Sequence, residues 1–197
     1  MAQNETFNNT NHVSSKVIVG YIGSWNQYIL DISDVNGNLY THLVYNHVGI
    51  YRDGTIRFFY GDDFPKLEKL TTKYPHLKIL ISVGGKYNGF MFSQLTTDAL
   101  QTFASNCKTL IQQYGLHGID IAWENPIESE KARYENVLKI LRQTLGPNAV
   151  ITAKAPTSVK DFDGFDEVAM NKIITNVVTP ENKTLKICNM NISERMR

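Results

Sequence analysis

Two patterns of hydrophobic and polar positions alternate along this chain, one typical of buried strands and one typical of amphipathic helices. Short apolar runs rich in β-branched residues predict six buried strands, at residues 16–25, 41–50, 77–85, 116–124, 149–156 and 184–192. Apolar residues at helical spacing predict helices between them, over residues 63–74, 97–114 and 128–145, with a weaker one between 165 and 178. After the Asp53-Gly54 turn, residues 55–59 predict a short extension or hairpin arm. Strands that alternate with amphipathic helices indicate an α/β fold with a parallel sheet.

Two architectures accommodate this pattern. One is a doubly wound open sheet, and the other is a TIM (β/α)8 barrel truncated to about six strands. With 197 residues, 42% of them hydrophobic, the chain suits a single globular unit. We expect a disordered polar leader over residues 1–15, which lacks a signal-peptide core, and one domain over residues 16–197.

Charge and cysteine content exclude several function classes. Lys and Arg number 20 against 19 Asp and Glu, so no basic excess points to nucleic acid. The apolar runs are too short to span a bilayer, so no membrane partner is expected. Cys107 and Cys188 are far apart and predict packing residues. The histidines show no metal-ligand spacing, and no metal or organic cofactor is implied.

The chemistry is concentrated in residues 116–124. In a strand, Gly118, Asp120, Ala122 and Glu124 share one face, so two carboxylates point the same way. Their backbones lie about 13 Å apart, from a rise of about 3.3 Å per residue, which is too far for a tight acid pair. Glu124 ends the strand at the edge where active sites of parallel α/β folds open, so it is a candidate general acid. A solvated carboxylate at the start of a loop is the alternative.

Glycines and aromatic residues near the strand ends are further candidates. Gly84 and Gly85 allow the backbone to approach either a ligand or a neighbouring strand closely. Aromatic rings at strand ends are able to stack on a flat or sugar ligand, although ordinary packing explains most aromatic residues. The aromatic candidates for substrate contacts are Tyr21, Trp25, Tyr45 and Trp123.

The segment Gly118–Glu124 resembles the signature strand of glycoside hydrolase family 18, the chitinase and chitinase-like family, which reads Asp-Gly-x-Asp-x-Asp-x-Glu. Ser82-Val83-Gly84-Gly85 is similar to the Ser-x-Gly-Gly of the family's third strand. The first, second and fifth strands also resemble the family's, so the agreement runs in register from Lys16 to about Pro156.

The resemblance implies a (β/α)8 barrel that binds or cleaves β-1,4-linked N-acetylglucosamine polymers such as chitin. Glu124 matches the family's acid, which protonates the glycosidic oxygen. The substrate's own N-acetyl carbonyl is the nucleophile, so the usual geometry of two carboxylates does not apply. An Asp two residues before the Glu holds that acetamide, and the Asp four residues before it, here Asp120, supports the middle one.

Two of the four acidic positions depart from the pattern, since His117 and Ala122 stand where the family has Asp. Asp120 therefore lacks its usual partner, and we expect hydrolysis to be strongly reduced because orientation and acid catalysis are both large effects. A lectin-like relative that binds such sugars without turnover, in effect a pseudoenzyme, is the alternative. An unrelated nucleotide-binding open sheet is disfavoured by the absence of a Gly-rich phosphate loop.

The strand count predicts unpaired edges. A barrel of this kind closes with eight strands, and six leave the first and sixth without a neighbour. Exposed strand edges favour association, so self-association through the open barrel edges is expected. The sequence indicates no compartment.

Overall fold

The computed structural model describes residues 17–23, 31–59, 63–124, 126–154 and 176–178. The expected leader, Trp25, Cys188 and the predicted strand over residues 184–192 lie outside these ranges. Within them, no helix is both long and apolar enough to cross a bilayer.

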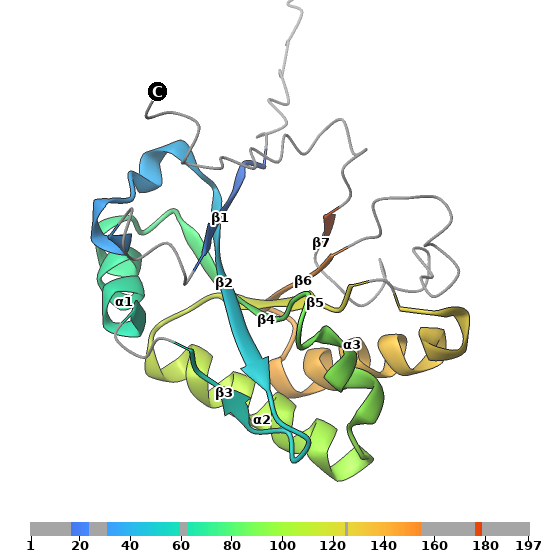
Figure 1. Cartoon of the computed structure of the whole chain (residues 1–197). Coiled ribbons are helices and arrows are strands. Elements are labelled where there is room, and N and C mark those ends of the chain that lie inside the picture. Colours follow the sequence, from blue (N-terminus) through green and yellow to red (C-terminus); the bar gives the residue numbers. More distant parts are fainter. Residues whose placement is uncertain (1–16, 24–30, 60–62, 125, 155–175, 179–197) are drawn as a thin grey trace, which may run out of the picture.

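A curved, mainly parallel sheet forms the centre of the molecule (Figure 1). Its strands pair in the order β1-β2-β4-β5-β6-β7, and each pair along this path is parallel. The short β3 (Ile56–Arg57) lies outside this path and pairs antiparallel with β2, as the predicted hairpin arm requires. The six strands of the path are β1 (Val19–Gly23), β2 (His42–Ile50), β4 (Lys78–Gly84), β5 (Gly118–Ala122), β6 (Val150–Lys154) and β7 (Asn176–Val178).

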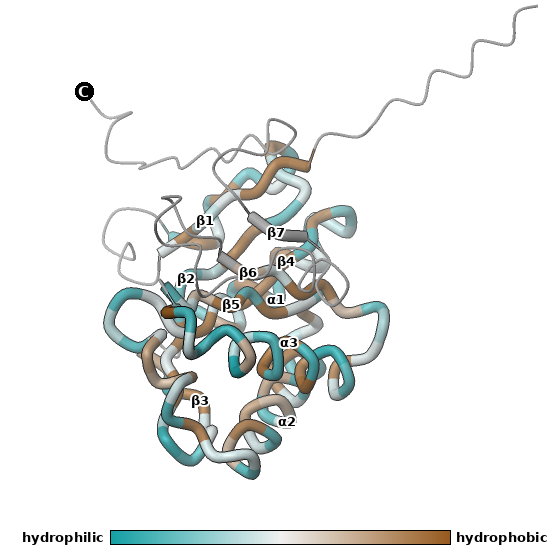
Figure 2. The backbone as a smooth tube through the Cα atoms, turned by 90° about the vertical axis from the view of Figure 1, so that its right-hand side faces the viewer, coloured by the Kyte–Doolittle hydropathy of each residue, from teal (hydrophilic) through white to brown (hydrophobic). Residues whose placement is uncertain are grey.

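The three predicted long helices are confirmed as α1 (Phe64–Lys73), α2 (Thr97–Gln113) and α3 (Lys131–Leu145). The Thr96 side chain accepts a hydrogen bond from the backbone of Ala99 and so caps the start of α2. Hydrophilic and hydrophobic segments alternate along α3, as expected for a helix with one buried face (Figure 2). Short 3-10 turns complete the connections, at η2 (Ile32–Asp34), η3 (Gly37–Leu39), η5 (Gly89–Gln94) and η6 (Glu128–Glu130).

β7 corrects one prediction. The weak helical pattern between residues 165 and 178 ends in a strand, Asn176–Val178, which pairs in parallel with Thr152–Lys154 of β6. Val177 and Val178 are β-branched and fit a pleated strand, so the predicted helix does not extend to residue 178. Residues 165–175 lie outside the described ranges. The strand that pairs with β6 therefore lies at residues 176–178, whereas the sequence pattern predicts the next strand at residues 184–192.

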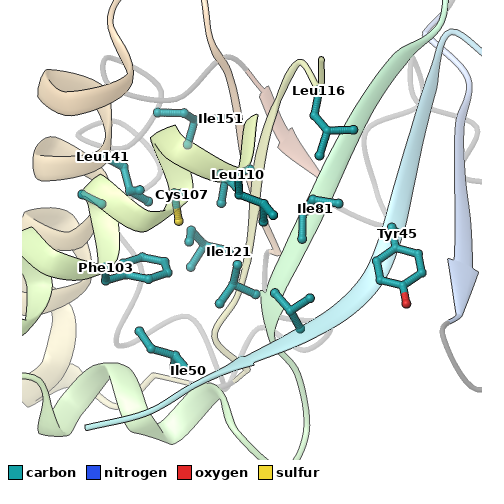
Figure 3. Close-up of a cluster of buried hydrophobic side chains, with 14 of the residues drawn as sticks. Tyr45, Ile50, Ile81, Phe103, Cys107, Leu110, Leu116, Ile121, Leu141 and Ile151 are labelled. Atoms are coloured by element: carbon teal, nitrogen blue, oxygen red, sulfur yellow. The ribbon is translucent and has the colours of Figure 1, made fainter. Parts of the chain in front are cut away.

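The main hydrophobic core lies between the outer face of the sheet and the helices (Figure 3). Ile81, Ile121 and Ile151 occupy this face on three adjacent strands, and all three are fully buried. From α2, Phe103 and Cys107 pack into the same cluster, which confirms that Cys107 is a packing residue. This core fixes which face of each strand is turned away from the helices.

The inner face of the sheet has a different composition. Near its amino end a small apolar cluster joins Val19, Val44 and Leu80 on β1, β2 and β4. Towards the carboxyl ends of the strands the next row is polar, because Ser82 is in register with Asp120 and Asp120 with Thr152. The inner face therefore changes from apolar to polar in the direction in which the strands run.

Candidate active site

Asp120 is the centre of the polar row on the inner face. It lies in the middle of β5 with only 1% of its surface exposed. The Ser82 hydroxyl of β4 donates to its Oδ2 over 2.7 Å, and the Thr152 hydroxyl of β6 donates to its Oδ1 over 2.6 Å. Each carboxylate oxygen thus accepts from a neighbouring strand, which compensates for the removal of the group from water.

These two hydroxyls hold Asp120 although its usual partner at position 122 is replaced by Ala122. Ser82 and Thr152 both stand in segments that resemble the family, but the sequence pattern alone does not identify either as a partner of Asp120. Their pairing depends on the relative register of β4, β5 and β6. The signal that could have found them is the inward position of a hydroxyl residue on the strands either side of an inward Asp.

Two tyrosines lie within the electrostatic field of Asp120. Tyr21, half-buried on β1, has its pKa raised by burial and further by the charge of Asp120. Tyr134 of α3 is fully buried, and the same two causes raise the pKa of its hydroxyl. Tyr21 is thus the one described aromatic candidate that lies on the inner side with Asp120, as a neutral phenol.

Gly84 and Gly85 allow β4 to approach β5 where both strands end. Both have positive φ, at 110° and 80°, which favours glycine. The Gly85 N–H donates to the Ala122 carbonyl over 2.8 Å, and a Cβ on Gly84 would lie 2.7 Å from that same oxygen. Of the two expected roles, a close approach to a neighbouring strand is the one found. Contact with a ligand stays a prediction.

Glu124 follows the end of β5 by two residues and is half-buried. The turn that opens η5 packs on the backbone that leads to it, since a Cβ on Gly89 would lie 3.3 Å from the Glu124 nitrogen. Glu124 is therefore held at the carboxyl edge of the sheet, beyond Ala122 and the buried Asp120. The order along the strand is a buried, hydrogen-bonded carboxylate, a methyl group, and a half-buried acid.

Tyr45 and Trp123 are not part of this edge, which corrects their expected role as sugar contacts. The Tyr45 ring is 1% exposed in the outer core, and its hydroxyl donates to Asp63 over 2.8 Å (Figure 3). Trp123 is 2% exposed and stacks on Phe92 with 5.6 Å between ring centroids. Side chains alternate between the two faces of a strand, and both residues stand at positions that point to the outer face. They therefore face the helices.

The chemistry that Glu124 is able to supply at this edge is proton transfer. Glu124 is a half-buried acid at the edge of the sheet, where a carboxyl group is able to protonate a leaving oxygen. Across the residue ranges given above, no three His, Cys, Asp or Glu side chains come together as a metal ion requires.

Comparisons with known proteins agree with the fold and the motif. The sequence pattern that defines "Glycosyl hydrolases family 18" matches residues 17–182. Chitotriosidase-1 of Mus musculus is 30% identical over 123 residues, which cover 57% of this chain and 26% of that protein. Chitinase-like protein Idgf4 of Glossina morsitans morsitans is 22% identical over 164 residues, covering 74% and 36%.

The fold is shared with solved chitinases. The Group IV chitinase of Ostrinia furnacalis, in complex with allosamidin, superposes with a TM-score of 0.76 at 24% identity. The match covers 83% of this chain and 50% of that one. This chain thus spans half of the solved structure and about a quarter to a third of the two curated relatives. The architecture is that of the TIM-barrel chitinases, represented here by about six parallel strands.

Proposed function

Because the chain belongs to glycosyl hydrolase family 18, we propose that the carboxyl edge of its sheet binds β-1,4-linked N-acetylglucosamine oligomers and hydrolyses them only slowly. Glu124 is the general acid of this proposal, and Asp120 is its electrostatic support. Tyr21, Gly84 and Gly85 line the same side of the sheet and are the proposed substrate contacts. Hydrolysis in this family uses the substrate's acetamide as the nucleophile, so no second enzyme carboxylate is needed for attack.

The position of Glu124 carries the proposal. It is half-buried at the end of β5, directly beyond a carboxylate whose two oxygens are held by Ser82 and Thr152. The solved Group IV chitinase of this architecture binds allosamidin, which supports a ligand-binding role for the same architecture in this chain. The same edge in this chain offers an acid, a two-glycine turn and a half-buried tyrosine.

Ala122 is the reason for slow turnover. It stands between Asp120 and Glu124 on the inner face, where the family has the Asp that orients the acetamide. A methyl group offers neither a hydrogen bond nor a charge, so the nucleophilic carbonyl is not held in line for attack. Loss of orientation lowers rates strongly even when the acid is present.

A lectin-like role is the second candidate, and the same residue favours it. Sugar binding requires the edge of the sheet but not a positioned acetamide, so Ala122 removes turnover more than affinity. Binding without release of product is the expected behaviour of such a relative.

The test compares the chain with two variants on a fluorogenic chitotrioside. Ala122→Asp is expected to raise turnover by about 10²-fold, the scale of a positioned polar group. Glu124→Gln is expected to reduce release to the background of buffer alone. Circular dichroism of each variant verifies that the fold is retained.

Retention on chitin beads separates the two candidates. Release above the Glu124→Gln background supports slow hydrolysis, whereas retention without release supports the lectin-like role. A chain that is neither retained nor active would contradict both.

A further inference from the structure

Three basic side chains come together at the amino end of the sheet, opposite the candidate active site. His42 of β2 is in register with Lys78 of β4, and neighbouring strands lie about 4.8 Å apart. His117 directly precedes β5, and its backbone N–H donates over 2.8 Å to the carbonyl of Ile79, the residue after Lys78. The three basic groups therefore converge on the start of β4 from neighbouring segments of the chain.

This basic cluster of His42, Lys78 and His117 is separate from the polar row around Asp120. Lys78 and Ser82 are four residues apart on β4, which is about 13 Å at a rise of about 3.3 Å per residue. Between them lies Leu80, a member of the inner apolar cluster. The inner face thus has a basic amino end and a polar carboxyl end, with an apolar layer between the two.

Hydrogen bonds fix which nitrogen of each imidazole carries a proton. The Thr41 hydroxyl donates to the Ile18 carbonyl over 3.0 Å, so its oxygen accepts from Nδ1 of His42, which is 2.9 Å away. Nδ1 of His117 accepts from the backbone N–H of Ile79 over 3.2 Å. In the neutral state, Nε2 of His42 is therefore an acceptor, whereas Nε2 of His117 carries a proton and is a donor.

The charges that act on these imidazoles are all basic. Burial lowers the pKa of His42, and the charge of Lys78 lowers it further. Burial, Lys78 and His42 do the same to the pKa of His117. In the part of the chain that the structure describes, no carboxylate is among these charges, and the exposed Lys78 forms no ion pair. Two half-buried imidazoles beside an uncompensated ammonium group favour an anion as their neighbour.

We propose that the basic cluster binds a tetrahedral oxyanion of the sulfate or phosphate type. The Nζ of Lys78 and the Nε2–H of His117 donate to the anion, and His42 donates from Nε2 once that nitrogen has taken up a proton. Protonation of His42 at Nε2 leaves its bond to Thr41 intact. Protonation of His117 at Nδ1 would displace the N–H of Ile79. Binding is therefore coupled to one proton, at His42, and the anion binds more tightly as the pH falls.

Inorganic sulfate is the probe, because its charge is the same at pH 5.5 and at pH 8. The full chain is titrated with sodium sulfate at both pH values, with the ionic strength held constant by sodium chloride. The NMR signals of the histidine ring protons report saturation. Circular dichroism verifies that each variant keeps the fold.

The variants remove one proposed donor at a time. His42→Asn and His117→Asn place an amide where Nδ1 was, so the bonds to Thr41 and Ile79 are retained while Nε2 is lost. Lys78→Gln removes the ammonium group at an exposed position, where no buried contact is lost. The matched control is Lys108→Gln, which removes an exposed ammonium group from α2.

We expect wild type to bind sulfate about tenfold more tightly at pH 5.5 than at pH 8, because one proton is taken up with the anion. Lys78→Gln and His117→Asn should each weaken binding about tenfold at both pH values, the value of one charge-assisted hydrogen bond. His42→Asn should remove most of the pH dependence. Lys108→Gln should bind as wild type does.

Three results would overturn the inference. One is the absence of saturable sulfate binding by wild type at pH 5.5. Another is an equal loss in Lys78→Gln and Lys108→Gln, which would show attraction to the overall charge of the chain rather than to a site. The third is a pH dependence that persists in His42→Asn. None of these results bears on the proposed function, because the basic cluster shares no residue with the candidate active site.

Discussion

The hydroxyl of Thr152 lies 2.6 Å from Oδ1 of Asp120, and the two residues are paired in register across β5 and β6. On the other side, the Ser82 hydroxyl of β4 donates to Oδ2 of Asp120. Each carboxylate oxygen thus accepts from one hydroxyl of one neighbouring strand. Because a carboxylate only accepts, both hydroxyl hydrogens are committed to it. The three residues therefore couple the alignment of β4, β5 and β6 to the support of the candidate active site.

Thr152→Val keeps the shape of the side chain and removes this donor. Hydrogen bonds to a charged group are worth about 1.5–3 kcal/mol, so we expect the free energy of unfolding to fall by that amount. Thr152→Ser should retain most of the stability because it keeps the hydroxyl. Urea unfolding followed by circular dichroism measures both variants. The matched control is Thr109→Val on the exposed part of α2, which should change the free energy of unfolding by less than about 0.5 kcal/mol. Equal losses of stability at the two positions would contradict a stabilising hydrogen bond from Thr152 to Asp120.

The sequence predicts the parts of this fold that depend on local pattern. The strands at residues 42–50, 78–84, 118–122 and 150–154 and the three helices come from apolar periodicity, and the structure confirms them. Register does not follow from periodicity alone, so the partners of Asp120 were not found. β7 was not predicted as a strand because three residues are too few to show a period.

In the candidate site, too, local alternation predicts some positions correctly, whereas others depend on how the strands are aligned. The alternation along β5 correctly places Asp120 on the inner face. The same alternation turns Trp123 outward, although its place near a strand end had suggested a sugar contact. The sequence around His47 indicates no role for this residue, and only the shifted register of β2 shows where it lies. An inserted residue in one strand has no signature in the hydrophobic pattern.

Gly118 of β5 lies directly against the backbone of Val150 in β6, and we expect Gly118→Ala to prevent normal pairing. A Cβ there would lie 1.8 Å from the Val150 carbonyl oxygen, and backbone cannot yield as a flexible side chain does. The loss should exceed about 3 kcal/mol, the range for severe overpacking, and should appear as a low soluble yield. Gly115→Ala is the comparison: its φ is +61° and the nearest atom to a Cβ is 3.7 Å away. That change should cost only about 1–2 kcal/mol. A soluble, stable Gly118→Ala protein would contradict this packing.

Tyr45→Phe tests the reassignment of Tyr45 from the site to the core. The change removes the donor to Asp63, which is 4% exposed. A buried acceptor that loses its partner costs about 1–3 kcal/mol, so we expect a lower urea midpoint. Binding of N,N′,N″-triacetylchitotriose should stay as in wild type, since the ring faces the helices. Weaker binding at unchanged stability would restore Tyr45 to the sugar site.

Two histidines at the amino ends of the strands predict how stability depends on pH. His42 is in register with Lys78, and the His117 ring accepts a hydrogen bond from the backbone N–H of Ile79. Burial lowers the pKa of His42, and the charge of Lys78 lowers it further. Burial, Lys78 and His42 together lower the pKa of His117. Both imidazoles are therefore held neutral in the folded chain.

As the pH falls below about 6.5, the ordinary histidine value, the unfolded chain binds protons at these positions before the folded chain does. The free energy of unfolding should then decrease, and the decrease should stop once the pH is below the folded pKa values. Urea unfolding at intervals between pH 8 and pH 5 measures the slope, above the range in which ordinary carboxylates titrate. The double variant His42→Gln, His117→Gln should flatten it, because the two groups that gain protons on unfolding are gone. A slope of unchanged size in the double variant would show that other groups cause the dependence.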